Sequence, residues 1–329
     1  MRKRDTYMPT SKLFKKVNIK LIFISAFCVC LFAVFFIFGG SVSECAKESL
    51  VFCASTLAPS LFPLMCASAM LLQSPASRYL GRLVFPLCKR LFGLSKNGSY
   101  VFLIGNLCGF PIGAQSAYGL YCDDNISKDE LECLIIFSST PSSAFVISAI
   151  GLNIFRSKSV GICLYVSALL SCIISGMIYK WVNLGKSCYS ENTYLSKKRC
   201  GFAHILCDSV RTSAQNMLYI CGFVVFFNLL CSVAILFVTE FGLSPIFNVI
   251  ISGLLELSSG AKAAGMLSFP ASAFLCALFI GWSGICVHFQ IFSVCKSVRI
   301  SYVRFFLWRA IVAVTCAMIC FVAFSLGFM

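Results

Sequence analysis

Charged side chains are scarce in this sequence. They make up 12% of its 329 residues, against about 25% in soluble domains, and the mean hydropathy is +0.90. Large polar domains are missing too, because the longest polar stretches are the N-terminus and the segments near 74–98 and 180–203. This composition excludes a soluble globular protein and indicates an α-helical membrane protein with several spans.

Motifs for catalysis and for ATP use are also missing. The sequence contains no H-E-x-x-H, no G-x-S-x-G and no Walker motif, and it has only 2 histidines. We therefore expect neither an enzyme nor an ATP-driven pump, and no cofactor. The 21 cysteines include no C-x-x-C pair, and most fall in apolar runs, where cysteine acts as a small hydrophobe. We expect no metal site.

Acidic residues are few, 12 against 27 lysines and arginines, which gives a formal net charge of +15. A basic chain can bind nucleic acid, but here the basic residues stand in short loops between apolar runs. In that position they orient the protein in the bilayer and contact anionic lipid headgroups. We therefore expect the lipid bilayer as a partner, and no nucleic acid.

Apolar runs follow one another along the whole chain. The candidate segments are 19–39, 49–72, 99–122, 131–154, 159–180, 213–238, 245–268, 271–295 and 305–328. The first run follows a basic stretch, as a signal peptide would. It is long for a signal peptide and no clear A-x-A site follows it, so an uncleaved transmembrane helix is favoured.

Two of these segments contain residues that break helices. Segment 99–122 contains GNLCGFPIGAQSAYG, with four glycines and a proline, and segment 245–268 contains GLLELSSGAKAAG. If all nine segments crossed the membrane, the basic loop 181–204 would lie outside, against the positive-inside bias. If both segments enter and return on the same side, that loop and the other basic loops lie mostly in the cytoplasm. A single Gly-rich spanning helix is the alternative for 99–122.

The two segments resemble each other. GFPIGAQSA at 109–117 aligns with ELSSGAKAA at 256–264, and each is followed by an apolar run that opens with phenylalanine. Under the topology with two re-entrant hairpins, the two halves of the chain are inverted copies. Inverted repeats with paired broken segments are typical of secondary transporters, which hold substrate near the middle of the membrane.

The predicted fold is therefore an all-α polytopic membrane protein, an inverted repeat with about seven transmembrane helices and two re-entrant hairpins. We expect four parts. Residues 1–45 form the basic cytoplasmic N-terminus and the first helix, and 46–180 form the first repeat. Residues 181–204 form a basic cytoplasmic loop, and 205–329 form the second, inverted repeat.

Several stretches also carry a family resemblance. They are TLAPSLFPL (56–64), GNLCGFPIGAQ (105–115), PSSAFVISAIG (141–151), DSVRTSAQNMLYICGFVVFF (208–227), GLLELSSGAK (253–262) and GWSGICVHFQ (281–290). In them the chain resembles the sporulation integral membrane proteins of the YlbJ type, which carry two Gate (nucleoside-recognition) repeats. The resemblance covers residues 45 to 325 and includes four elements in order, G-[YF]-P-x-G-A, a proline-containing helix, E-x-[TS]-x-G and G-x-x-x-x-x-Q.

The resemblance implies a fold like the core of concentrative nucleoside transporters. It also implies transport of dipicolinic acid across the outer forespore membrane during spore formation. Two departures leave the substrate open. Gln115 stands where the family commonly has a basic residue, and Ser138–Thr140 stand where it commonly has asparagine before the proline.

An anionic substrate in a low-dielectric cavity needs donors that are already in place. Hairpin tips supply backbone N–H groups and helix N-termini, and nearby neutral side chains add hydrogen bonds. The candidate substrate-binding residues are Gly109, Pro111, Gly113, Gln115, Thr140, Pro141 and Ser142 in the first half and Ser258, Ser259, Gly260, Lys262, Ser283 and Gln290 in the second. Close helix packing is the alternative role of the glycines.

Three ionisable residues in the second half carry sharper hypotheses. Glu256 is the candidate site for a coupling proton or sodium ion, with a structural hydrogen bond as the alternative. Lys262 is assigned to a substrate carboxylate, with a structural pair to Glu256 as the alternative. His288 is a second proton candidate, although a lone histidine near a helix end is more often a packed residue.

The leading hypothesis from the sequence is a secondary transporter of a small organic anion, dipicolinate according to the resemblance, coupled to a proton or sodium ion. A structural or assembly protein of the spore envelope and a nucleoside-type transporter are the alternatives. The sequence leaves the coupling ion, the direction of flux and the oligomeric state open.

Overall fold

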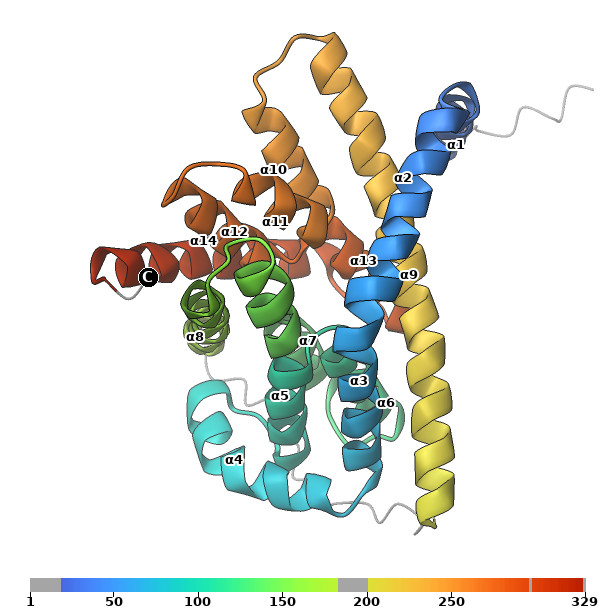
Figure 1. The fold of residues 1–329 in the computed structure, drawn as a ribbon. Helices are drawn as coiled ribbons and strands as arrows, with labels where there is room; N and C mark the ends of the chain where they lie inside the picture. The colour runs from blue at the N-terminus through green and yellow to red at the C-terminus, as the bar shows by residue number, and fades with distance from the viewer. Residues whose placement is uncertain (1–18, 183–200, 296–297, 328–329) are drawn as a thin grey trace, which may run out of the picture. The chain divides into compact units, whose positions relative to one another are not determined.

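The computed structural model describes residues 19–182, 201–295 and 298–327, and these are helical with no strand (Figure 1). The elements are α1 (Ile19–Ile37), α2 (Gly39–Phe52), η2 (Cys53–Leu57), α3 (Ala58–Gln73), α4 (Ala76–Phe92), α5 (Lys96–Cys108), α6 (Ile112–Cys122), α7 (Lys128–Phe137), η3 (Phe145–Leu152), α8 (Lys158–Val182), α9 (Phe202–Glu240), α10 (Ile246–Leu255), α11 (Leu257–Gly265), α12 (Ala271–Trp282), α13 (Gly284–Val294) and α14 (Tyr302–Ser325). The chain forms two compact units, Met1–Cys45 and Ala46–Met329. The hairpins, broken helices and cavity described below belong to the second unit.

Among the residues that the structure describes, five helical stretches are long and apolar enough to cross a membrane. They are Gly39–Gln73, Lys158–Val182, Phe202–Glu240, Ala271–Val294 and Tyr302–Ser325. This confirms a polytopic helical membrane protein, but the count is lower than the seven expected from the sequence. The first apolar run forms α1, whose apolar part Leu21–Ile37 is shorter than these stretches, and the segment expected at 131–154 is interrupted.

The first Gly-rich segment folds back on itself as a helical hairpin. α5 and α6 flank a turn at Gly109–Pro111, and the Asn97 side chain at the start of α5 donates to the Asn125 carbonyl just after α6, at 3.5 Å. The two helices touch where Gly105 faces Gly113, since a Cβ on Gly105 would lie 2.9 Å from the Gly113 Cα. Both ends of the segment therefore lie together, which a single spanning helix would not allow.

The second segment has the same construction. α10 and α11 pack on each other around a break at Glu256, which has an extended backbone. They cross where Gly253 faces Gly260, so closely that a Cβ on Gly260 would clash with the Gly253 Cα. Figure 1 shows this hairpin in the upper part of the drawing and α5–α6 in the lower part.

The two ends of the long helix α9 lie near the starting points of the two hairpins. Near its start, Asp208 accepts a hydrogen bond at 3.0 Å from Gln73, the last residue of α3, and the chain runs from there through α4 into the first hairpin. At its other end α9 stops at Glu240, five residues before Pro245 leads into α10. A helix of this length is about 58 Å long, so the hairpins start near opposite ends of α9.

A broken helix follows each hairpin and covers its tip. After α7 the chain is non-helical from Ser138 to Ser142, and the Phe110 amide donates to the Thr140 carbonyl at 3.0 Å. Gly109, with φ of 85°, approaches so closely that a Cβ there would lie 2.5 Å from the Ser142 nitrogen. In the second half, between α12 and α13, a Cβ on Gly284 would lie 3.0 Å from the Leu257 nitrogen. Protein thus covers the non-helical backbone, as membrane depth requires.

Two regions expected to be loops are helical. The basic segment near 74–98 contains α4, whose apolar residues at helical spacing were hidden by the basic residues among them. The gap expected between the runs at 19–39 and 49–72 is occupied by α2, which continues through η2 and α3 as one helix, Gly39–Gln73. The part of the expected loop 181–204 that falls on 183–200 lies outside the described residues.

The close contact at Gly113 predicts a sharp difference between two glycines of α6. Adding a methyl group in Gly113→Ala forces it against the Ser138 carbonyl, whereas a Cβ on Gly119 meets nothing within 4 Å. We expect Gly113→Ala to lower the free energy of unfolding by about 1–3 kcal/mol. Gly119→Ala should leave it unchanged or raise it by up to about 1 kcal/mol. Thermal unfolding in detergent measures both, and equal shifts would contradict the hairpin packing.

The base of the first hairpin holds a buried carboxylate. Glu130, at the start of α7 and outside the five apolar spans, accepts a hydrogen bond from the Ser95 amide at 2.7 Å through Oε1. Its other carboxylate oxygen is buried without a partner. Burial raises the pKa of the Glu130 carboxyl to about 7, although the hydrogen bonds from Ser95 oppose the shift.

This raised pKa predicts a pH-dependent stability. The folded chain holds the Glu130 proton more tightly than the unfolded chain does, so protonation favours the fold. The contribution is complete below the ordinary value of 4.5 and is lost as the pH rises through about 7. We expect Glu130→Gln to remove the corresponding part of the decline in unfolding temperature between about pH 5 and about pH 8. Parallel pH curves for parent and variant would show that Glu130 titrates normally.

Candidate functional site

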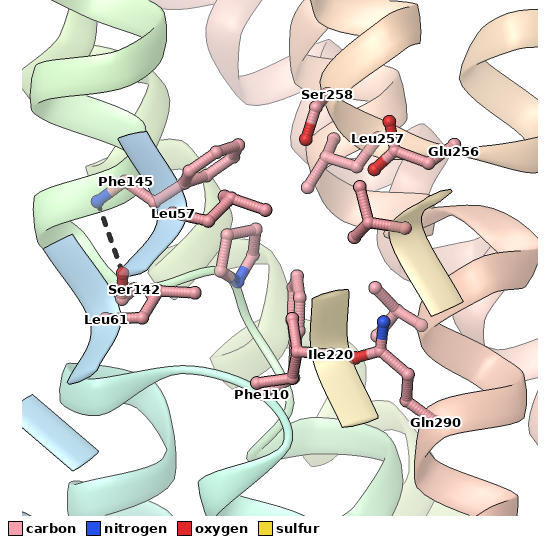
Figure 2. Close-up of a pocket in the computed structure, with 13 residues that line it drawn as sticks. Leu57, Leu61, Phe110, Ser142, Phe145, Ile220, Glu256, Leu257, Ser258 and Gln290 are labelled. Atoms are coloured by element: carbon pink, nitrogen blue, oxygen red, sulfur yellow. Dashed lines mark hydrogen bonds between the residues drawn. The ribbon is translucent and has the colours of Figure 1, made fainter. Parts of the chain in front are cut away.

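One cavity lies where the two halves of the second unit meet. The space between its walls, counted together with the open solvent at its mouth, is about 410 Å³. Its walls come from α3, the first hairpin tip, the break after α7, α9, the second hairpin tip and α13 (Figure 2). The lining residues are Leu57, Leu61, Phe110, Pro141, Ser142, Phe145, Ile220, Val224, Glu256, Leu257, Ser258, Val287 and Gln290.

Helix α9 shows how the two tips converge on this cavity. Asn216 donates to Gln115 of the first hairpin at 2.8 Å, and three turns further along Asn228 accepts from the Ser259 hydroxyl of the second hairpin at 2.6 Å. Ile220 and Val224 stand between these two asparagines and line the cavity.

Glu256 is the one ionisable side chain among the described residues that line the cavity. Only 2% of its surface is exposed, and its carboxylate caps α11 by accepting from the Ser259 amide at 2.7 Å. Ser259 is held in turn by Asn228, which donates to Ser49 at 3.0 Å. This chain of hydrogen bonds fixes the Glu256 carboxylate at the start of α11, where it lines the cavity.

Gln290 supplies a second polar group. It is buried, and its Oε1 has no hydrogen-bond partner, while its Nε2 contacts only the weak acceptor sulfur of Cys286 at 3.4 Å. Figure 2 shows its amide directed into the cavity, across from Phe110. An unpartnered buried amide oxygen costs free energy unless a ligand or water completes it, so Gln290 is poised to bind one.

Several predicted site residues lie elsewhere. Thr140 donates to the Asn106 side chain at 3.1 Å, and Gln115 is engaged with α9. His288 is fully buried among the rings of Trp282, Phe305 and Phe306, and its Nε2 contacts the Trp282 carbonyl at 2.7 Å. The hairpin residues that shape the tips without lining the cavity are Gly109, Pro111, Gly113, Ser259 and Gly260.

Lys262 does not reach the cavity. Its side chain is exposed on α11 and its ammonium lies over the ring of Phe52, 4.3 Å from the centroid. Lys262 is therefore not placed to contact a substrate carboxylate in the cavity, and it forms no ion pair with Glu256 in this structure. Spacing alone placed Lys262 in an apolar segment, but the face it occupies is set by how α11 packs.

Arg309, which was not among the residues predicted from the sequence, lies deep in the apolar helix α14. It is 1% exposed, and it donates to the Ile136 carbonyl at 3.0 Å, to the Gly281 carbonyl at 2.5 Å and to the Ser283 hydroxyl. Its positive charge thus sits at the C-terminal ends of both α7 and α12, where helix dipoles favour a cation. Ionisable residues within membrane-spanning segments are rare and often functional, so the position of Arg309 inside an apolar run could have identified it from the sequence.

No cluster of three or more histidine, cysteine or acidic side chains suited to a metal ion occurs among the described residues. Where the two hairpins meet, the chemistry is instead a carboxylate, an amide and two hydroxyls, Ser142 and Ser258, among apolar walls. Polar groups set among apolar walls are typical of sites that bind small molecules by hydrogen bonds and apolar contact.

The fold and this buried site define an integral membrane protein of the polytopic helical class. No protein-family model matches the chain, and no solved structure matches it. The chain is similar to the sporulation integral membrane protein YlbJ of Bacillus subtilis (strain 168), with 24% identity over 307 residues, 83% of this chain and 75% of that protein. This similarity supports the YlbJ-like family that the motifs indicated.

The position of Arg309 yields a prediction about stability. Arg309→Leu leaves two carbonyls and a hydroxyl at the helix ends without their donor, so we expect a loss of about 3 kcal/mol. Arg304→Leu on the same helix is the control. Arg304 pairs with Glu132 at 2.9 Å, but its side chain is 47% exposed, so the loss should stay under about 1 kcal/mol. Thermal unfolding in detergent distinguishes them, and equal losses would contradict the assigned role.

Proposed function

We propose that this protein is a secondary transporter of a small organic anion. The observation that carries the proposal is the cavity at which both hairpin tips and both broken helices meet, with Glu256 and Gln290 at its wall. A structural membrane protein has no need of such a cavity or of a carboxylate and an unpartnered amide within it. We do not propose an enzymatic activity for this cavity, because its polar lining residues form no nucleophile–base pair.

The proposal includes an inverted repeat of residues 46–180 and 205–329, for which the likeness of the two hairpins is the support. In both halves a hairpin crosses at a pair of glycines, its tip meets the break of the following helix, and one asparagine of α9 holds it. The hairpins start near opposite ends of α9. Re-entrant hairpins that enter from opposite faces are the arrangement of transporters with a concentrative-nucleoside-transporter-like core, which hold substrate near the membrane midplane.

The cavity wall suggests how an anion would be held. Among the described residues that line it there is no lysine or arginine, and Glu256 already caps the N-terminal end of α11. The charge would therefore be met by the hydroxyls of Ser142 and Ser258. Phe110 and Phe145 offer apolar ring faces to a flat substrate. An aromatic dicarboxylate such as dipicolinate has this combination of a flat ring and anionic edges.

Glu256 suggests how transport would be coupled. An ionised carboxylate beside the cavity repels an anionic ligand, so the ligand binds best when Glu256 carries a proton. Substrate and proton would then bind together and cross together. A sodium ion bound at Glu256 would remove the repulsion in the same way, and ion dependence of uptake separates the two.

A nucleoside-type substrate is the second candidate. The observation that favours it is the position of Lys262, the one cation expected at the cavity, which lies instead over Phe52. Apart from Glu256, the polar side chains that line the cavity are neutral hydrogen-bonding groups between apolar walls. Thermal shifts of the purified protein with dipicolinate, nucleosides and simple carboxylates discriminate the two candidates. Stabilisation by nucleosides alone would overturn the anion assignment.

We further propose that the protein acts during spore formation, in the outer forespore membrane of a spore-forming bacterium. The name of its Bacillus subtilis relative supports the link to sporulation. Fluorescence microscopy of a tagged chain in sporulating cells tests the location. Signal confined to the vegetative cell membrane would contradict it.

The coupling hypothesis predicts the behaviour of vesicles that contain only this protein. With an inward proton gradient they should accumulate labelled dipicolinate, and Glu256→Gln should lower gradient-driven accumulation by about 10-fold or more, because the site no longer exchanges its proton. Glu240→Gln, at the exposed end of α9, is the matched control and should transport normally. Lys262→Met should also retain uptake. Normal accumulation by Glu256→Gln would remove Glu256 from the mechanism, and no uptake by any variant or the parent would favour a structural role.

A further inference from the structure

Helix α4 presents two exposed faces of different chemistry. Tyr79, Leu83 and Leu87, four residues apart along one face, expose 70%, 77% and 60% of their surfaces. The side chains of Arg82 and Lys89 are exposed on the adjoining face, and that of Arg90 is exposed in the last turn, next to the apolar face. The helix has four basic residues and no acidic one. An amphipathic helix with a basic polar face is typical of segments that lie in a membrane surface.

The remaining face of α4 holds it against the protein. Gly81, Cys88 and Phe92 are buried, at helical spacing, and α4 packs extensively on α5. A Cβ on Gly81 would lie 2.7 Å from the Lys96 carbonyl, so the two helices are in direct backbone contact. The exposed faces are therefore held in a fixed orientation.

Both ends of α4 meet the end of an apolar span. It starts just after Gln73, where the span Gly39–Gln73 ends. At its other end the carbonyls of Lys89 and Arg90 accept from Lys180, at 3.3 and 2.7 Å, two residues before the span Lys158–Val182 ends. In Figure 1 the helix runs along the bottom of the drawing, below α3 and α5. Its basic residues exclude α4 as a spanning helix, so it lies where spans end.

We propose that α4 is an interfacial helix that binds anionic phospholipid headgroups of the cytoplasmic leaflet through Arg82, Lys89 and Arg90. Leu83 and Leu87 then enter the acyl region beneath them. Charge complementarity favours this occupant, since a helix with no acidic residue fits a negative lipid surface better than a zwitterionic one. The inference goes beyond the proposed transport and holds whatever the substrate is.

Quenching by brominated lipids tests the inference on the full chain. Leu83→Trp is reconstituted in vesicles of equal phosphatidylglycerol and phosphatidylcholine, with bromine on the acyl chains of one or the other. The parent spectrum is subtracted. We expect brominated phosphatidylglycerol to quench the added tryptophan about fivefold more strongly, because each basic residue at the surface attracts anionic lipid. Adding Arg82→Gln, Lys89→Gln and Arg90→Gln should bring the two lipids to equal quenching.

Val314→Trp on α14, where Val314 is 58% exposed, is the control and should be quenched equally by both lipids. If Leu83→Trp fails to insert, Leu87→Trp reports on the same face. Absence of quenching by either lipid would overturn the proposal, because protein, such as a second copy of the chain, would then cover the face. Equal quenching that ignores the charge substitutions would also overturn it, since the helix would sit in lipid without recognising headgroups.

Discussion

The architecture depends on one constraint, that every backbone N–H and carbonyl group at membrane depth needs a partner inside the protein. The chain breaks its helices at Gly109, Ser138–Ser142, Glu256 and Ser283, and each break frees backbone groups. The breaks satisfy one another, since each hairpin tip lies against the break of the next helix. Arg309 completes the arrangement by donating to carbonyls at the ends of α7 and α12.

Glycine makes this mutual coverage possible. The helices of each hairpin touch at a glycine pair, and the contact at Gly113 extends to the Ser138 carbonyl of the broken helix. Close backbone approach brings the tips to the centre of the unit, where the side chains of Glu256 and Gln290 border one cavity. The site is thus a consequence of how the breaks pack. Its polar residues Ser142, Glu256 and Ser258 lie at or near those breaks, and Gln290 lies within α13.

The class of protein and the positions of the breaks could be predicted well from the sequence, because glycine, proline and charge within an apolar run weaken or interrupt a spanning helix. Gly109, Pro141 and Glu256 all mark breaks in the structure. The environment of Lys262 could not be predicted, since the exposed face of α11 is set by contacts with distant elements. The acceptors of Arg309 could not be predicted, because they lie up to 173 residues away in the sequence, and α4 was missed because its basic residues resembled a loop.

Arg309 has a mechanical consequence. It belongs to α14, yet it holds the end of α7 from the first half and the end of α12 from the second. As long as these bonds persist, the three helix segments form one rigid body, and the halves cannot rock apart along that seam. If the cavity opens first to one side of the membrane and then to the other, α7, α12 and α14 would have to move together as one rigid body relative to α3 and α9.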